Sequence, residues 1–193
     1  MVNEILIEKV RQFVEDECKK PDSNYKDAYD LHFVSMHKIA KELAERLGAD
    51  IEIVEIAAWL HDIGSIIEGR ENHHIIGAVI AEEFLKKLNY PEDKIEKVKI
   101  CILNHRGSKE DINERNSIES KIIAESDVLD CFDNISKQFV ITLVDEKKSL
   151  EDAKISVRNK LKSKWNQLEF EESRNLIRPK FEAVMLLLGE ENE

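Results

Sequence analysis

The sequence IEIVEIAAWLHD, residues 51–62, is apolar on nearly every side of a helix and ends in a histidine followed by an aspartate. A helix that is apolar all round belongs inside a protein core rather than on its surface. His61 and Asp62 then lie at the end of a buried helix, where a carboxylate is unfavourable unless a positive charge is beside it. Within eight residues of Asp62 on either side, Arg70 is the only Lys or Arg. We therefore expect a metal ion near this helix end.

The composition favours one helical domain without a membrane span. The 193 residues are 42% hydrophobic and include only 6 Gly and 3 Pro, which favours helices over turn-rich β structure. The first residues, MVNEILIEKV, lack the basic start and apolar core of a secretory signal. The formal net charge of −11 disfavours long nucleic acid as a partner. A metal can still make one pocket positive enough for a small phosphorylated substrate.

The three cysteines, Cys18, Cys101 and Cys131, are odd in number and far apart, with no CxxC pair. This usage is typical of a reducing compartment in which thiols serve as small apolar residues. We therefore expect a cytoplasmic protein. A homodimer is compatible with the sequence, which does not decide the oligomeric state.

Apolar spacing predicts helices along the whole chain and therefore an all-α domain. A loop is expected over residues 63–72, and residues 138–144, QFVITLV, are expected to be helical because a lone strand would have no partner. Pro179 is expected to kink or split the last helix. The expected helices span residues 3–18, 25–47, 51–61, 73–88, 91–104, 117–135, 149–165 and 172–188.

All six histidines fall between residues 32 and 105. Helical spacing places His32, His105 and Asp127 on apolar faces, and it places His73 and His74 equally well, so it does not separate these two. Taken singly, an inward histidine is more often a hydrogen-bonded core residue than a ligand. Several imidazoles and two carboxylates with few nearby cations fit a metal site better. Nitrogen and oxygen ligands without thiolate suit iron, manganese, zinc or cobalt rather than calcium.

Four of these residues resemble the pattern of a known family. His32, the pair His61–Asp62 and Asp127 resemble the H…HD…D pattern of the HD superfamily of metal-dependent phosphohydrolases. The segment LHDIG also resembles the hallmark of its HDIG branch. The resemblance implies that these four side chains hold a first metal ion, with Asp62 and His61 as the catalytic residues.

Two further segments extend the resemblance to a second metal ion. HHIIGA resembles the part of two-metal members in which a histidine lies four residues before a glycine, which selects His73 over His74, with Gly77 as the glycine. ILNHRG resembles a later segment of the family and selects His105. The second ion would share Asp62 with the first and add these two histidines.

The resemblance covers residues 30–134 and implies a single-domain HD-type helical bundle over residues 1–193. Its metal-site core is expected over residues 25–136, with C-terminal helices over residues 137–190 packing on it. The implied cofactor is a divalent transition metal, as one or two ions of iron, manganese, cobalt, zinc or nickel, with magnesium as an alternative.

The chain departs from the family pattern in places. Ser65 stands where HDIG proteins often have lysine, which puts in doubt a charge contribution to phosphate binding there. Glu125 and Ser126 replace the common Asp-Ala before the ligand aspartate. No GYP segment follows His105, so a cyclic-di-GMP phosphodiesterase activity is set aside.

The implied reaction is hydrolysis of a phosphate ester of a nucleotide or another small phosphorylated molecule by metal-activated water. Candidate substrate contacts, each weighed against a solvated surface residue, are Arg106, Arg70 and Lys109. Candidates for supporting the ligands, each weighed against an ordinary structural role, are Asp130, His74, His37 and Glu119.

Three other functions stay open at this point. HD-fold di-iron oxygenases could use the same six ligands, and a mixed-valence iron signal with oxygen dependence would distinguish them. A non-catalytic sensor that binds a ligand through the metal is disfavoured by the complete ligand set. A nuclease acting on long nucleic acid is disfavoured by the net charge.

Overall fold

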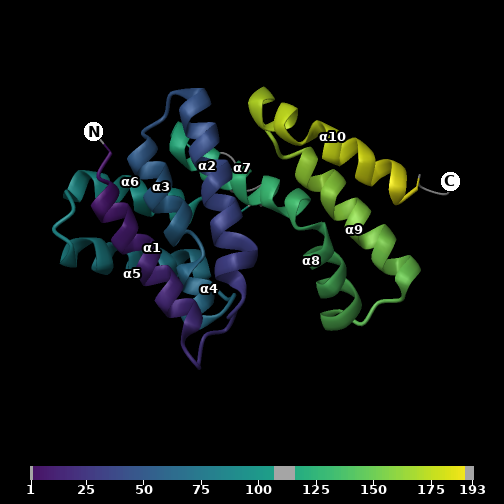
Figure 1. The fold of residues 1–193 in the computed structure, drawn as a ribbon, viewed down its shortest axis with the longest axis horizontal. Coiled ribbons are helices and arrows are strands. Elements are labelled where there is room, and N and C mark those ends of the chain that lie inside the picture. The colour runs from purple at the N-terminus through teal and green to yellow at the C-terminus, as the bar shows by residue number, and fades with distance from the viewer. Residues whose placement is uncertain (1, 107–115, 190–193) are drawn as a thin grey trace. The chain divides into compact units, whose positions relative to one another are not determined.

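The computed structural model describes residues 2–106 and 116–189, and every regular element among them is helical (Figure 1). This confirms the all-α expectation. Within these residues, no helix combines the length and the apolar character that crossing a membrane requires. The elements in chain order are α1 (Glu4–Lys19), the π-helical turn η1 (Tyr29–Phe33), α2 (Val34–Leu47), α3 (Ile51–Leu60), α4 (Ile63–Glu68), α5 (His73–Lys87), α6 (Glu92–Leu103), α7 (Ile118–Asp133), α8 (Ile135–Val140), the π-helical turn η3 (Ile141–Asp145), α9 (Leu150–Trp165) and α10 (Glu171–Leu187).

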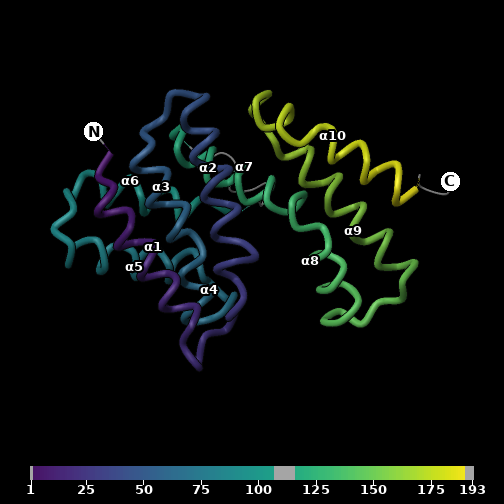
Figure 2. The backbone as a smooth tube through the Cα atoms, in the orientation of Figure 1, coloured from purple at the N-terminus to yellow at the C-terminus, as the bar shows by residue number. Residues whose placement is uncertain are grey.

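The chain forms two compact units, residues 1–127 and residues 128–193, which can be followed by colour along the tube in Figure 2. The first unit contains α1 to α6 and most of α7, and the second contains the end of α7 and the helices after it. All six candidate metal ligands belong to the first unit. The expected single domain, with a core over residues 25–136, stays a prediction.

The central helix of the first unit is α3, as the sequence predicts. Asp50 precedes it as N-cap, and the Asp50 carboxylate accepts a hydrogen bond from the Ile53 amide at 3.3 Å. Every residue from Glu52 to Leu60 is buried, and the helix packs against α1, α2 and α6. Because the helix ends inside the unit, His61 is fully buried.

The structure corrects the loop that was expected over residues 63–72. The first half of this stretch is helix α4, whose first turn is closed by the amides of Ser65 and Ile66, which donate to the carbonyl of Asp62. Ile63 and Ile66 are buried, so packing outweighs the low helix propensity of the glycine between them.

Some of the other helices begin or end at different residues from those expected from the sequence. The helix expected over residues 25–47 begins with η1 at Tyr29, whose carbonyl accepts the amide of Val34. Such a π-helical turn is rare and often occurs at a functional site. The helical expectation for residues 138–144 is confirmed by α8 and η3. Pro179 lies inside α10 and does not split it.

The second unit has an apolar core of its own. Ala153, Val157 and Leu161 of α9 are buried, one turn apart along the helix. The Trp165 ring stacks on Phe181 of α10, with ring centroids 4.3 Å apart. These contacts pair α9 with α10, and both helices were expected from the apolar spacing.

A buried carboxylate near the start of α3 links three helices of the first unit. Glu52 accepts hydrogen bonds from the Asn3 amide at 2.7 Å, the Tyr90 hydroxyl at 2.9 Å and the Lys94 ammonium at 2.7 Å. Burial alone would raise the pKa of Glu52, but these three donors outweigh it and lower the pKa. The ionised carboxylate therefore stabilises the packing of α1 and α6 on α3.

We predict that Glu52→Gln lowers the free energy of unfolding by about 1–3 kcal/mol at neutral pH, because the amide cannot accept from all three donors. Since folding lowers the pKa of Glu52, its stabilisation is complete above the unfolded-state pKa of about 4.3 and is lost as the pH falls. Urea unfolding should show the difference between wild type and variant shrinking below that pH. The exposed Glu83, replaced by glutamine, is the control. A difference that does not depend on pH would contradict the assignment.

Candidate metal centre

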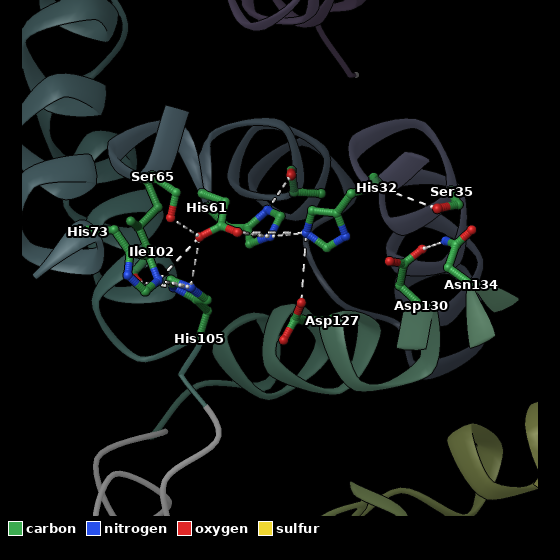
Figure 3. A network of polar contacts seen from close by, with 12 residues as sticks. His32, Ser35, His61, Ser65, His73, Ile102, His105, Asp127, Asp130 and Asn134 are labelled. Carbon is green, nitrogen blue, oxygen red and sulfur yellow. Dashed lines mark hydrogen bonds and ion pairs between the residues drawn. The ribbon is translucent and has the colours of Figure 1, made fainter. Parts of the chain in front are cut away.

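The first unit brings six side chains from five elements into one place (Figure 3). They form two groups, and within each group the candidate ligand atoms all lie within 4.8 Å of one another. The first group is His32 of η1, His61 after α3 and Asp127 of α7. The second group is Asp62, His73 at the start of α5 and His105 after α6. These are the six ligands that the sequence resemblance selects.

Asp62 lies between the two groups and turns one carboxylate oxygen toward each. Its Oδ1 is 3.2 Å from His73 Nε2 and 3.6 Å from His105 Nε2. Its Oδ2 is 3.8 Å from His32 Nε2 and 3.9 Å from His61 Nε2. The side chain is 28% exposed, so the carboxylate is less buried than the sequence suggested. This is the arrangement of a carboxylate that two neighbouring cations can share.

Three of the imidazoles are oriented by their own backbone. The Nδ1 atoms of His61, His73 and His105 lie 2.8, 2.8 and 2.6 Å from the carbonyl oxygen of the residue three positions earlier. Since a carbonyl can only accept, each Nδ1 carries the hydrogen, and the Nε2 of the neutral ring carries a lone pair. The three Nε2 lone pairs are therefore available to a metal ion.

These lone pairs converge closely enough to share one cation. His73 Nε2 and His105 Nε2 are 3.2 Å apart, and because the Nδ1 of each ring already carries a hydrogen, either an added proton or a metal ion can lie between them. His32 Nε2 and His61 Nε2 are 3.0 Å apart, and Asp127 Oδ1 is 3.7 Å from His32 Nε2. Two nitrogens bound to one ion at about 2.1 Å would be separated by about 3.0–3.4 Å. The donor set and its spacing fit a divalent transition metal.

The pKa shifts of His61, His73 and Asp62 suit metal binding, whereas the shift of His105 means that a proton competes with a metal ion for its Nε2. Burial lowers the pKa of His61 to about 4 and lowers that of His73. Burial alone would raise the pKa of Asp62, but the His105 hydrogen bond and the neighbouring imidazoles hold it well below its ordinary value. Burial alone would lower the pKa of His105, but the Asp62 carboxylate raises it. The carboxylate is thus ionised, as a metal ligand must be.

Two glycines bring α4 and α5 together so that His73 reaches Asp62. A Cβ atom on Gly64 would lie 2.1 Å from the His73 carbonyl oxygen and 2.8 Å from the Gly77 nitrogen. Both of these neighbours are backbone atoms, which cannot turn aside as a flexible side chain can. The helices can approach this closely only because position 64 has no side chain.

The other candidates for supporting the ligands have different contacts. The His37 ring contacts Glu55 at 3.1 Å and stacks on Trp59, and neither group includes it. His74 is also outside both groups, with its ring centroid 5.7 Å from that of its neighbour His73. Asp130 accepts from Asn134 Nδ2 at 2.8 Å (Figure 3). The supporting roles of His37, His74 and Asp130 stay predictions.

Glu119 has a contact at the opposite end of α3 from the candidate ligands. Its carboxylate accepts the Asp50 amide at 3.2 Å, so it helps to hold the start of the buried helix. Sequence reasoning missed one polar contact inside the site. The Ser65 hydroxyl donates to Asp62 Oδ1, and the signal was the three-residue spacing, which places the two side chains on the same side of a helical turn.

The three basic residues that were candidate substrate contacts lie in different surroundings or outside the described residues. Arg106 is exposed and follows His105. Burial is the main cause of the lowered pKa of His73, and the positive charge of Arg106 adds a smaller contribution. Arg70 is exposed, and its carbonyl accepts from His73. Lys109 lies outside the described residues.

The chain is similar to a known protein family and to several known proteins. The family model described as HD domain matches residues 29–131, more than half of the chain. An uncharacterised protein of Clostridium beijerinckii is 39% identical over 82 residues, covering 40% of this chain and 52% of that protein. A tRNA (cytidine(56)-2'-O)-methyltransferase of Picrophilus torridus is 29% identical over 160 residues, covering 75% of this chain and 44% of that protein. The chain thus spans about half the length of these two relatives.

Solved structures resemble the chain over nearly its whole length. An HD-superfamily hydrolase from Bacillus thuringiensis has a TM-score of 0.74 at 21% identity, covering 96% of this chain and 94% of that one. YpgQ of Bacillus subtilis, crystallised in complex with ADP, has a TM-score of 0.69 at 18% identity, covering 91% and 90%. Identities this low show a shared fold alone.

We predict that Gly64→Ala lowers the free energy of unfolding by about 3 kcal/mol, because its Cβ has to push α4 away from the backbone of α5. Gly48→Ala is the matched control, since Gly48 has a positive φ of 69° but nothing within 4 Å of its Cβ position. That variant should lose only about 1 kcal/mol, the strain of the left-handed conformation. Equal urea midpoints for the two variants would show that the close approach is not a constraint.

Proposed function

Because this chain belongs to the HD domain family, we propose that it is a metal-dependent phosphohydrolase acting on a nucleotide or another small phosphorylated molecule. The observation that carries this proposal is the Asp62 carboxylate, which faces two groups of candidate ligands on its two oxygens. Such a shared carboxylate is typical of sites in which two ions act on one phosphoryl group. A site for a single structural ion would not need it.

The residues would hold the metal as follows. His32, His61 and Asp127, together with Asp62 Oδ2, would hold a first ion, and His73, His105 and Asp62 Oδ1 would hold a second. When bound, such ions lower the pKa of a coordinated water and neutralise negative charge on the phosphoryl group.

The chain itself contributes orientation and charge. The hydrogen bonds from Nδ1 to backbone carbonyls keep the rings of His61, His73 and His105 in one orientation. Their Nε2 atoms therefore need little rearrangement when a metal ion binds. The ionised Asp62 can also accept a hydrogen bond from the attacking water and direct its lone pair toward phosphorus. Arg106, the residue after His105, would contact a phosphate oxygen as a charged donor.

The substrate class follows from charge and from one structural relative. The net charge of −11 disfavours a long polyanion, whereas a single phosphate needs only a local cation. The complex of YpgQ with ADP supports a nucleotide as the ligand of this fold. We therefore place nucleotides first among the small phosphorylated molecules to be tested.

The experiment that tests the function combines metal analysis with a panel of phosphomonoesters and phosphodiesters. We predict that protein expressed with added manganese binds the metal and hydrolyses part of the panel, and that His61→Ala lowers the rate by at least about 100-fold through loss of a ligand. The control is Val54→Ala, which truncates another buried side chain of α3 away from the site and should keep its activity.

A wild type that binds no transition metal would overturn the proposal. Metal binding without turnover of any phosphoester would instead favour the oxygenase or the sensor, and a mixed-valence iron signal would select the oxygenase. Comparable loss of activity in His61→Ala and Val54→Ala would mean that general destabilisation, rather than loss of a ligand, explains the effect.

A second prediction concerns substrate binding. Arg106→Gln should raise KM about tenfold for the preferred phosphoester, equivalent to about 1.4 kcal/mol, with a smaller change in kcat. The control is Arg46→Gln, because Arg46 is paired with Glu42 on α2 and belongs to neither ligand group. The same KM in the wild type and Arg106→Gln would remove Arg106 from the substrate site.

A further inference from the structure

Ser65 contacts the shared carboxylate from the side of the second group. It is the third residue of α4, and its hydroxyl donates a hydrogen bond to Asp62 Oδ1 at 3.1 Å (Figure 3). Only 5% of the residue is exposed, so water competes little for this contact. The accepting oxygen is the one that lies 3.2 Å from His73 Nε2 and 3.6 Å from His105 Nε2.

The backbone that carries this hydroxyl is fixed at both ends of α4. At the start, the Ser65 amide donates to the Asp62 carbonyl at 2.9 Å, and the adjacent Gly64 lies against the backbone of α5. At the other end, the amide and the side-chain Nδ2 of Asn24 donate to the Ile66 carbonyl at 3.1 and 3.2 Å. Because its backbone is held, the hydroxyl restrains the carboxylate rather than following it.

The geometry points to Ser65 as a positioning residue that holds Asp62 Oδ1 toward the second group and thereby sets the metal affinity of that group. Without the hydroxyl, the carboxylate is freer to turn about its Cβ–Cγ bond, and Oδ1 loses its fixed direction. The first group has two imidazoles and a second carboxylate, Asp127, so it depends less on the orientation of Asp62. This inference rests on the proposed function and adds that the two ions depend unequally on one hydroxyl.

The test is calorimetric titration of metal-free full-length protein with Mn²⁺, followed by electron paramagnetic resonance. In the wild type we expect two binding steps and a spin-coupled signal from two ions that share Asp62. Ser65→Ala should weaken one step by about 10–100-fold, as is usual when a hydrogen bond to a ligand is removed, and leave the other within about threefold. At two equivalents of Mn²⁺, the variant should then show an uncoupled signal.

Two further variants make the result specific. Ser65→Thr keeps the hydroxyl and should restore the weakened step. Ser35→Ala removes a hydroxyl that donates to the His32 carbonyl at 3.1 Å, a backbone atom that binds no metal, so both steps should stay within about threefold of the wild type. If Ser65→Thr folds poorly, judged by circular dichroism, Ser65→Cys replaces it and should give an intermediate affinity because a thiol is a weaker donor.

The outcomes separate this inference from the proposed function. Unchanged binding in Ser65→Ala, or equal weakening of both steps, overturns the role of Ser65 and leaves the phosphohydrolase proposal intact. A wild type that binds a single Mn²⁺ and still hydrolyses phosphoesters also overturns the role of Ser65 and leaves the phosphohydrolase proposal intact. A wild type that binds no metal overturns both.

Discussion

The negative charge of Asp62 is the constraint on which the rest of the first unit depends. It stands at the end of a helix whose residues 52–60 are all buried, and four imidazole nitrogens lie within 3.9 Å of its two oxygens. A carboxylate in such surroundings is stable only with compensating positive charge. Four elements, η1, α5, α6 and α7, each position a side chain that can share a cation, and α4 supplies the Ser65 hydroxyl that donates to Asp62.

Local backbone contacts carry much of this organisation. The same hydrogen bond, from Nδ1 to the carbonyl three residues earlier, recurs at three of the four candidate histidines. It orients the ring through its own segment, so the distant elements need only deliver each segment to the right place. The long-range contacts therefore set positions, while the short-range ones set directions.

The sequence predicts the parts that periodic apolar spacing or an ordered motif can encode. Spacing alone identifies the buried helix at residues 51–61. The choice of His73 over His74 came from the resemblance, because each of the two lies in line with apolar residues. Helix α4 was missed because Gly64 inside it and Gly69 just after it lower the local helix propensity, which the burial of Ile63 and Ile66 outweighs. The Glu52 contacts could not be foreseen, since they join residues far apart in the chain.

The glycine of LHDIG differs in kind from the histidine and aspartate before it. The histidine and the aspartate contribute side-chain atoms to the site, whereas Gly64 contributes by having no Cβ atom. Its absence allows the axes of α4 and α5 to lie close together. A search for similar centres in other genomes should therefore weigh this glycine as heavily as the ligands. A sequence with all six ligands but a bulkier residue at this position would have the same donors on helices too far apart to share one carboxylate.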